Sequence, residues 1–324
     1  MNRSHTLTRQ QLGFSLIELM VSLTIGMVIM LAVVSAYLGA AGAGRTADAI
    51  GRMNEDAQMA LSILSQQLRM AGVNPTQADR TTVSAGLNPR GNSVPLHNTL
   101  TNAFAIRGCD LPFTNVTTGG ISTGALNCGH AASSTGPDSI SIAYEADRYN
   151  TVATGTGTPT DCMGSGITPI TATYTQSNGT GTATATIYEA ENRFYVGSTT
   201  NIVNPTLWCK GSNSTQQPLI ENIENLQLSY GTSNPGVTPT RVLGYLSAYE
   251  VDTDTTTLTG AAGHWTRWNA VKAVRICVVA RSENEVLDNL SSAKYMDCNG
   301  VLVTSPPDKR LRRAYTTTVV IRNQ

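Results

Sequence analysis

Few residues in this sequence have both the type and the spacing that catalysis needs. His130 and His264 could act as bases, but no motif places a nucleophile beside either of them. Gly164-Ser165-Gly166 lacks the G-x-S-x-G frame of a nucleophile elbow. The sequence also has no P-loop and no G-x-G-x-x-G after a strand. We therefore expect no enzyme and no cofactor, and we interpret the histidines as structural.

The six cysteines could form disulfides or bind a metal. None forms a C-x-x-C pair, and none has a histidine at ligand spacing, so we expect no metal site. An even number of cysteines in an exported region favours disulfides. Six cysteines allow fifteen pairings, between which the sequence alone does not choose. We take the sequential pairing as the expectation: Cys109–Cys128, Cys162–Cys209 and Cys277–Cys298.

Two clusters of charged residues could bind ions or polyanions. Asp252-Thr253-Asp254 is a fragment of a calcium loop, without the glycine and the terminal glutamate of an EF-hand. The basic run 309–313, Lys-Arg-Leu-Arg-Arg, could contact DNA, anionic headgroups or an acidic face of another protein. We prefer the plainer interpretation of this run, a solvated turn before the last strand.

The composition gives no electrostatic case for nucleic acid as the main partner. The chain has 324 residues, with 22 Lys and Arg against 22 Asp and Glu, so its formal net charge is zero. Nucleic acid as the main partner usually shows as a raised isoelectric point or a basic face. Only 14% of the residues are charged and 6% are aromatic. Polar surface must therefore come from Thr, Ser, Asn and Gly, which suits β-structure and loops outside the cytosol.

The N-terminal segment has the pattern of a membrane anchor. Residues 1–13 are polar and basic, and an apolar run from Phe14 to Tyr37 contains Glu18 as its only charged residue. About 20 apolar residues in a helix cross the hydrocarbon core, so this run is long enough. The basic leader before it and the large polar region after it place the N-terminus in the cytoplasm.

Glu18 distinguishes this segment from simpler targeting sequences. A secretory signal peptide could be cut near residues 40–43, and a plain signal anchor would not be cut. Neither explains a carboxylate in an apolar segment, which is costly and usually has a partner. Cleavage after Gly13 would create an amine at Phe14, within one helical turn of Glu18. The two charges could neutralise each other within one chain or between neighbouring chains.

The run from Gly13 to Leu19, GFSLIEL, resembles the class III leader motif of type IV prepilins and type II secretion pseudopilins. In that family the prepilin peptidase, a membrane aspartyl protease, cuts after the glycine and methylates the new N-terminus. The resemblance implies cleavage between Gly13 and Phe14, N-methylation of Phe14, and a role for Glu18 in subunit docking. Major pilins commonly carry a proline in this helix, whereas the first proline here is Pro75.

The elements after the leader predict an α+β, pilin-like fold. Apolar residues spaced by three and four continue the helix in amphipathic form until Gly72 and Pro75 stop it. We expect residues 218–230 to run from a helical turn into a strand, and residues 231–268 to form a long loop. Further strands are expected at 139–144, 185–188, 193–196, 207–210, 271–280 and 316–322. A long helix, its first half spanning the membrane, would thus pack on an antiparallel β-sheet domain with long loops.

The chain should therefore divide into four parts. Residues 1–13 would be the leader peptide, and residues 14–44 the transmembrane and filament-core half of the helix. Residues 45–72 would be its amphipathic half. Residues 73–324 would form a periplasmic or extracellular β-rich domain.

The C-terminal half resembles the PilW family of minor pilins. The resemblance rests on Leu207-Trp208-Cys209 and on residues 217–227, 273–277 and 313–319, which follow one another in the expected order. Proteins of this family are thought to sit at the pilus tip. There, with other minor pilins, they prime assembly for twitching motility, adhesion and DNA uptake.

The resemblance also implies partners and a location. The partners would be other minor pilins, the major pilin, the prepilin peptidase and the inner-membrane assembly platform. The protein would be a single-pass protein of the bacterial inner membrane before assembly and part of the pilus at the cell surface afterwards. The alternatives are a pseudopilin of a type II secretion system, or a tip adhesin whose loops at 150–185 contact a surface or DNA.

Overall fold

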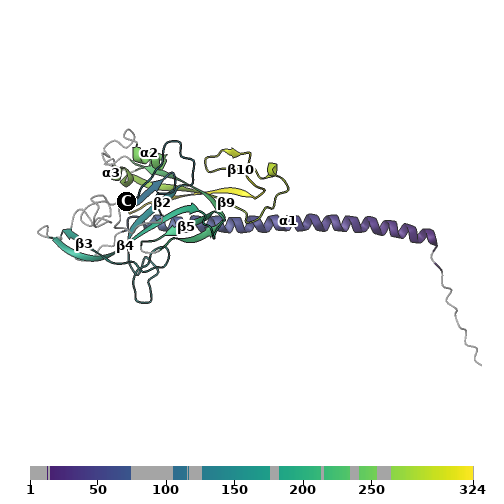
Figure 1. Cartoon of the computed structure of the whole chain (residues 1–324), viewed down its shortest axis with the longest axis horizontal. Coiled ribbons are helices and arrows are strands. Elements are labelled where there is room, and N and C mark those ends of the chain that lie inside the picture. Colours follow the sequence, from purple (N-terminus) through teal and green to yellow (C-terminus); the bar gives the residue numbers. More distant parts are fainter. Residues whose placement is uncertain are drawn as a thin grey trace, which may run out of the picture. The chain divides into compact units, whose positions relative to one another are not determined.

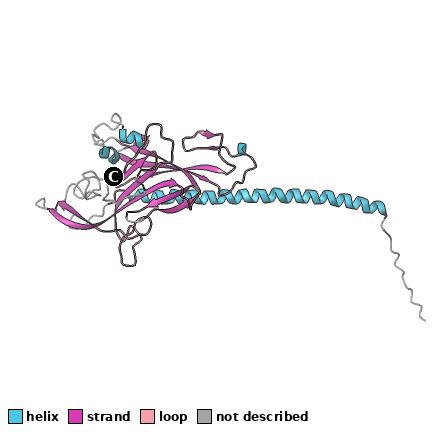
Figure 2. Cartoon of the chain, in the orientation of Figure 1, coloured by secondary structure: helices cyan, strands magenta, loops and turns pink. Residues whose placement is uncertain are grey.

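The computed structural model describes residue 13 and residues 15–73, 105–114, 116, 126–175, 182–212, 215–233, 241–253 and 264–323. The chain divides into two compact units, Met1–Asp48 and Ala49–Gln324, and the boundary in the sequence falls within the first helix. Figure 1 labels the elements, and Figure 2 distinguishes helices from strands. We describe the two units in turn.

The first unit contains the start of α1, a helix that extends from Leu16 to Met70. The predicted long helix, including its amphipathic continuation, is confirmed. It ends where Gly72 adopts a φ of 74°, a left-handed conformation that glycine tolerates and that commonly terminates helices. The Gly72 N–H donates to the carbonyl of Ala143, so the end of α1 is bonded to a strand.

In the second unit, α1 buries one stripe of side chains against the sheets. The buried residues recur at spacings of three and four, the period of one helix face: Met53, Ala57, Ala60, Leu64 and Leu68. They belong to one hydrophobic core with strand residues such as Phe194 and Val278. Two of these five residues are alanines, Ala57 and Ala60, and both are fully buried. In Figure 1 the strands β5 and β9 run beside this part of α1.

The first sheet has the strand order β1-β2-β4-β5-β6, and β3 pairs with β4 outside this path. Every pairing in it is antiparallel. Its strands are β1 (Ile106–Cys109), β2 (Ser139–Ala146), β3 (Ile170–Thr175), β4 (Thr182–Gly197), β5 (Thr206–Lys210) and β6 (Gln217–Glu221). The two short strands expected at 185–188 and 193–196 are wrong, because β4 is one continuous strand. Its first part pairs with β3, and its second part pairs with β2 and β5.

The second sheet has the order β12-β9-β7-β8, again with antiparallel pairs. Its strands are β7 (Ile223–Thr232), β8 (Gly244–Leu246), β9 (Val271–Arg281) and β12 (Arg312–Val320). The expected strand at 271–280 is confirmed and lies between two neighbours. The last strand begins four residues earlier than expected. Arg312 and Arg313 pair with Arg281 and Ala280 of β9, so two of the five residues of the supposed turn are strand.

The expected helical turn before residue 223 is wrong. Residues 217–221 form β6 in the first sheet, and residues 223–232 form β7 in the second. Between them Asn222 has a φ of 63°, a left-handed conformation that asparagine adopts more readily than most residues. A single residue therefore passes the chain from one sheet to the other.

The long loop expected at 231–268 is also partly wrong. It contains β8, α2 (Ala248–Thr253) and α3 (His264–Asn269), while residues 234–240 and 254–263 lie outside the described part of the chain. A further excursion between β9 and β12 contains η3 (Leu290–Ser292), β10 (Tyr295–Met296) and β11 (Leu302–Val303).

Three disulfides cross-link the second unit, and they pair the cysteines in sequential order, as expected. They join Cys109 to Cys128, Cys162 to Cys209, and Cys277 to Cys298. The second connects the loop before β3 to the buried Cys209 of β5. The third attaches the β10–β11 excursion to the central strand β9.

Candidate functional site

The N-terminal end of α1 carries a reciprocal pair of hydrogen bonds. The Glu18 N–H donates to Ser15 Oγ at 3.3 Å, and the Ser15 N–H donates to Glu18 Oε2 at 3.0 Å. This arrangement is a capping box, which satisfies two backbone donors that a helix start leaves free. The Glu18 carboxylate also lies in the first turn, where it complements the helix dipole. Phe14, the residue expected to be methylated, lies outside the described residues, whereas Gly13 lies within them.

The following turns of α1 are long and apolar enough to cross a membrane. The most apolar window has a mean hydropathy of 2.4, and none of it is buried in the protein. Leu16 is 80% exposed and Leu31 67%, values that would be costly in water. The hydroxyls of Ser22, Thr24 and Ser35 donate to carbonyls three residues earlier, so they are satisfied within the helix. This half of α1 is thus suited to a lipid or protein environment.

Polar side chains fix the amphipathic half of α1 to both sheets. Asn192 of β4 donates to Gln67 Oε1 at 2.8 Å and to the Tyr144 hydroxyl at 3.2 Å. Burial raises the pKa of Tyr144 to about 12, although the hydrogen bonds of its hydroxyl with Asn192 and Gln67 act in the opposite direction. On the second sheet, the Tyr315 hydroxyl donates to Asn54. The helix is therefore held by specific pairs as well as by its apolar stripe.

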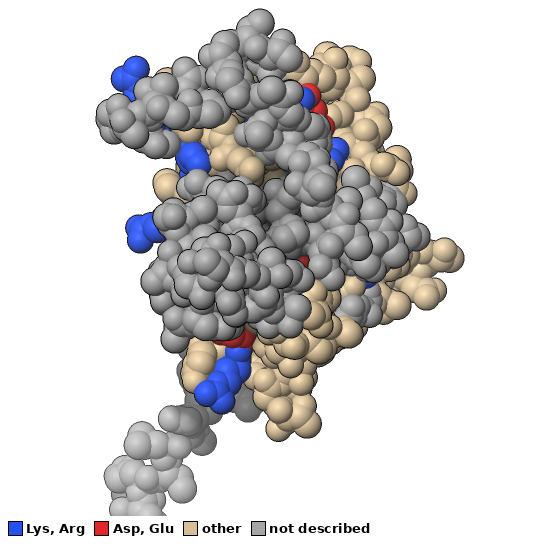
Figure 3. Space-filling model, turned by 90° about the vertical axis from the view of Figure 1, so that its left-hand side faces the viewer, with Lys and Arg blue, Asp and Glu red and all other residues tan. Residues whose placement is uncertain are grey.

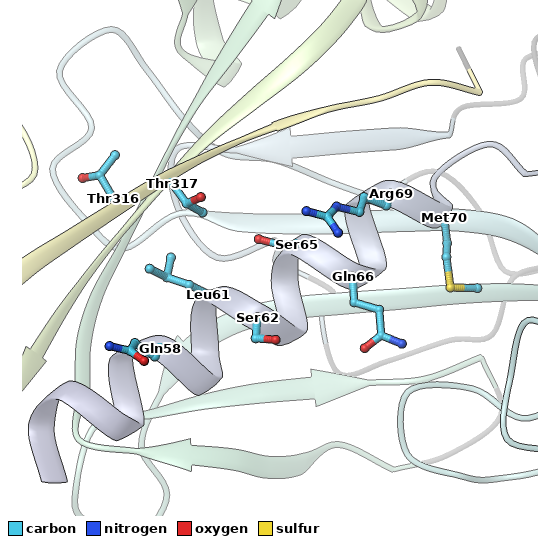
Figure 4. A pocket seen from close by; sticks show the side chains of 9 residues that line it. All are labelled: Gln58, Leu61, Ser62, Ser65, Gln66, Arg69, Met70, Thr316 and Thr317. Carbon is cyan, nitrogen blue, oxygen red and sulfur yellow. The ribbon is translucent and has the colours of Figure 1, made fainter.

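A groove lies between this half of α1 and the outer strand β12 (Figure 4). It has a volume of about 690 Å³. Its lining is mostly polar: Gln58, Leu61, Ser62, Ser65, Gln66, Arg69, Met70, Thr316 and Thr317. In Figure 4, Leu61 and Ser65 extend from the helix towards the strand.

The basic run 309–313 is only partly solvated. The Arg312 side chain is fully buried, and its Nε donates to Glu224 at 2.5 Å while one of its terminal nitrogens donates to Asp308 at 2.7 Å. Burial lowers the pKa of Arg312, but the bonds to both carboxylates outweigh it and raise the pKa overall. Arg313 is exposed. The expected solvated turn is therefore wrong for Arg312, which is a structural ion-pair residue.

His130 lies in a buried cluster that links β1 to α2. Its Nδ1 accepts the backbone N–H of Asp110 at 3.3 Å, so its proton belongs on Nε2, which lies 3.1 Å from Asp252 Oδ2. The Asp110 carboxylate accepts the N–H groups of Ala248 and Tyr249, which begin α2.

Asp252 does not present an open calcium ligand. Its other oxygen accepts the Trp268 indole N–H at 2.7 Å, and the Arg107 guanidinium lies 3.7 Å from Oδ2. Asp254, its partner in the calcium-loop fragment, lies outside the described residues. His130 also lies near the sulfurs of Cys109 and Cys128, but these form a disulfide and are not thiolate ligands.

Charge gathers nowhere on the described part of the face drawn in Figure 3. Basic and acidic side chains are scattered among uncharged residues there. This agrees with the zero formal net charge.

Sequence reasoning missed two features of these surfaces. The Ser-x-x-Glu spacing at 15–18 is the signature of a capping box, and it would have shown that Glu18 has a local role. The groove beside β12 has no signal of its own in the sequence, because it depends on where a strand lies relative to a helix. Of the histidines other than His130, His5 and His97 lie outside the described residues, as does the His264 side chain.

Two family models match the chain. Residues 8–34 match the prokaryotic N-terminal methylation motif, which covers Gly13, Phe14, the capping box and most of the apolar run. Residues 193–323 match type IV pilus-assembly protein W, from the second part of β4 to the end of β12. No curated protein and no solved structure matched the chain. A prepilin leader at one end of the chain and this assembly segment at the other together support a type IV pilus minor pilin of the PilW family.

Proposed function

We propose that the chain is processed between Gly13 and Phe14, methylated at Phe14, and then built into the pilus with Glu18 as a docking group. The support is the methylation motif at 8–34 together with a helix start at Leu16, directly after the proposed cut. Until assembly, residues 14–44 would anchor the protein in the inner membrane as a single pass with the N-terminus in the cytoplasm. Residues 45–72 would form the amphipathic half of the helix, and residues 73–324 the periplasmic domain.

Within the pilus, the proposed role is to prime assembly near the tip together with other minor pilins. The major pilin would then be added beneath this group of minor pilins. The observation that carries this proposal is the match of residues 193–323 to a pilus-assembly family. The prepilin peptidase and the inner-membrane assembly platform would be the partners before assembly. Twitching motility, adhesion and DNA uptake would then depend on this chain because they depend on pili.

The processing step is tested by mass spectrometry of the protein from pilus preparations. We expect an N-terminal peptide that begins at Phe14 and carries one added methyl group. A Gly13→Leu variant should keep the full leader, and an Arg9→Gln variant, changed outside the cleavage pair, should be processed normally. Recovery of chains that still begin at Met1 from assembled pili would contradict the proposal.

The priming role is tested by deleting the gene and counting surface pili. Restoring the natural chain should restore piliation, whereas Glu18→Ala should not, although it should be processed at Gly13. Glu55→Ala, an exposed glutamate farther along the same helix, serves as the matched control. Normal piliation with Glu18→Ala would exclude a docking role for this carboxylate, and normal piliation in the deletion strain would exclude priming.

A further inference from the structure

The strand β12 leaves a sheet edge open. The strands at the ends of the two sheet orders are β1, β6, β8 and β12. The first has four residues, all buried, β6 contains Pro218, and β8 has three residues. In contrast, β12 has nine residues, contains no proline, and pairs with β9 without a register shift. It is the strand among these four that is best suited to accept a further strand.

The hydrogen bonds at both ends of the β12–β9 ladder show which residues face this edge. Ile321 donates to the carbonyl of Lys272, directly opposite, and Ser282 donates to that of Leu311, also opposite. In an antiparallel ladder, residues bonded to the partner strand alternate with residues whose backbone groups point away. Residues 311 and 321 are bonded to the partner, so the odd-numbered residues face β9. The outward-facing residues are Ala314, Thr316, Thr318 and Val320.

The groove between β12 and α1 lies along this edge. Thr316 and Thr317 form its strand side, and Gln58, Ser62 and Gln66 contribute hydrogen-bonding groups from the helix. Its volume of about 690 Å³ leaves room for an extended backbone (Figure 4). Across the described part of the chain, no backbone or side-chain hydrogen bond is made to the outward groups of Thr316 or Thr318.

We propose that β12 receives an extended segment of another pilus subunit, which pairs with residues 314–320 as an additional strand. Proteins normally cover or blunt a long open edge, since it otherwise pairs with other chains. Strand addition would satisfy the outward backbone groups, and the groove would hold alternate side chains of the incoming segment against α1. This proposal rests on the proposed function, because it requires the chain to be built into a pilus. It goes beyond the priming role, because the same strand pairing would operate at the tip or in the shaft.

The charges around the edge indicate the chemistry of the incoming segment. Arg69 lines the groove, the exposed Arg313 and Arg322 lie near the ends of β12, and the lining contains no acidic residue. A segment with a carboxylate beside Arg69 would fit. A second copy of this chain would fit less well. Antiparallel self-pairing about Thr317 would bring Arg313 of one copy close to Arg322 of the other, and like charges across strands are unfavourable.

The proposal is tested in piliated cells with a photo-crosslinking amino acid at position 318 of the full-length chain. We expect a crosslink to a different pilus subunit, mapped to a segment that contains an acidic residue. Thr316→Pro removes an outward N–H without removing a bond to β9, so it should lower the crosslink yield about tenfold. Thr316→Val keeps that N–H and should leave the yield unchanged. Equal yields in the two variants would overturn the proposal.

A second arm does not depend on how well a proline is tolerated in the strand. Arg69→Glu should lower the crosslink yield several-fold, and Arg69→Lys should keep it. Arg52→Glu is the matched control, because Arg52 is an exposed arginine of the same helix outside the groove. A crosslink only to a second copy of this chain, or none to another pilus subunit, would overturn the proposal. Pili are counted in the same cells, so loss of priming is scored separately from loss of the crosslink.

Discussion

Ser15 and Glu18 form a capping box at the start of α1, and the proposed processing would give Glu18 a second role. The capping box fixes the Glu18 carboxylate on the Ser15 N–H while residues 1–13 are still attached. Once the chain is cut, the proposed amine of Phe14 would lie close to the same carboxylate. Cleavage would thus give the Glu18 carboxylate the Phe14 amine as a partner, in place of the Ser15 N–H or in addition to it. The capping box would keep the first turn of the helix formed during cleavage.

The cap predicts a difference between two substitutions of Ser15. Ser15→Ala should destabilise the start of the helix by about 1 kcal/mol, because Ala cannot accept the Glu18 N–H. Ser15→Thr should cost much less, since threonine retains the accepting oxygen. The measurement is amide hydrogen exchange of residues 16–19 in the full chain in detergent. Equal exchange in the two variants would show that the hydroxyl does not cap the helix.

The buried carboxyl of Asp138 should make the stability of the folded domain depend on pH. Burial raises its pKa well above the usual value, although the Leu228 N–H that it accepts at 2.6 Å opposes this. A carboxyl with a raised pKa in the folded state favours folding while it is protonated. Its contribution is complete below the unfolded pKa of about 3.9 and is lost as the pH rises through the folded pKa.

Asp138→Asn removes this titration and keeps an acceptor for Leu228. We therefore expect the variant to gain stability relative to the natural chain as the pH rises from about 4 to 8. The measurement is the difference in Tm between the two proteins across this range. Because both contain every other titrating group, those groups cancel in the difference. A difference that does not change with pH would show that Asp138 titrates alike in the folded and unfolded chains.

At the scale of elements, the start of β12 depends on one ion-pair cluster. Arg312 connects β12 to Glu224 of β7 and to Asp308 in the preceding turn. Burial alone would raise the pKa of Asp308, but its hydrogen bonds with Arg312 and the Arg310 N–H lower it. This carboxylate therefore contributes stability above its unfolded pKa of about 3.9 and loses it as the pH falls through the folded pKa.

The two neighbouring arginines offer a matched comparison. Arg312→Gln should destabilise the domain by about 2 kcal/mol, because it leaves two partly buried carboxylates without their cation. Arg313→Gln should change stability by less than about 1 kcal/mol, because Arg313 is exposed. Urea unfolding at neutral pH measures both. Equal losses in the two variants would contradict the structural role given to Arg312.

Elements with strong local patterns could be predicted from the sequence, and those set by long-range pairing could not. The helix α1 and the strand β9 have clear periodicity, and both are confirmed. In contrast, β4 contains Glu189, Glu191 and Asn192, polar residues that read as a break between two strands. They continue the strand because β2 pairs with them on one side, which no local pattern shows. The helical turn predicted before residue 223 failed because the bend is made by Asn222 alone.

The candidate sites divide in the same way. The leader and the apolar helix follow from residue types in order, so they were predictable. The burial of Arg312 and the open edge of β12 depend on which strands are neighbours, and the basic run 309–313 therefore looked more solvated than it is.

At the scale of the whole molecule, the disulfides join segments that are distant in the sequence. The sequence separation of the bonded cysteines is 47 for Cys162–Cys209 and 19 for Cys109–Cys128. In the chain-entropy model, closing the longer loop contributes about 4 kcal/mol and the shorter about 3. The double variant Cys162→Ala/Cys209→Ala should therefore lose more stability than Cys109→Ala/Cys128→Ala. Urea unfolding of the full chains decides the order, and the reverse order would show that strain or packing outweighs chain entropy.

The Cys162–Cys209 bond also has a mechanical consequence for a subunit of a filament that is pulled. When a filament is pulled, a disulfide carries the force directly between its two cysteines. The chain segment between them is therefore not extended. The two cysteines are separated by 47 positions in the sequence, which would span about 160 Å in a fully extended chain, and the bond prevents the load from extending nearly all of that length. Even if the domain partly unfolds under force, this loop, which contains β3 and β4, would stay short and could refold locally once the load falls.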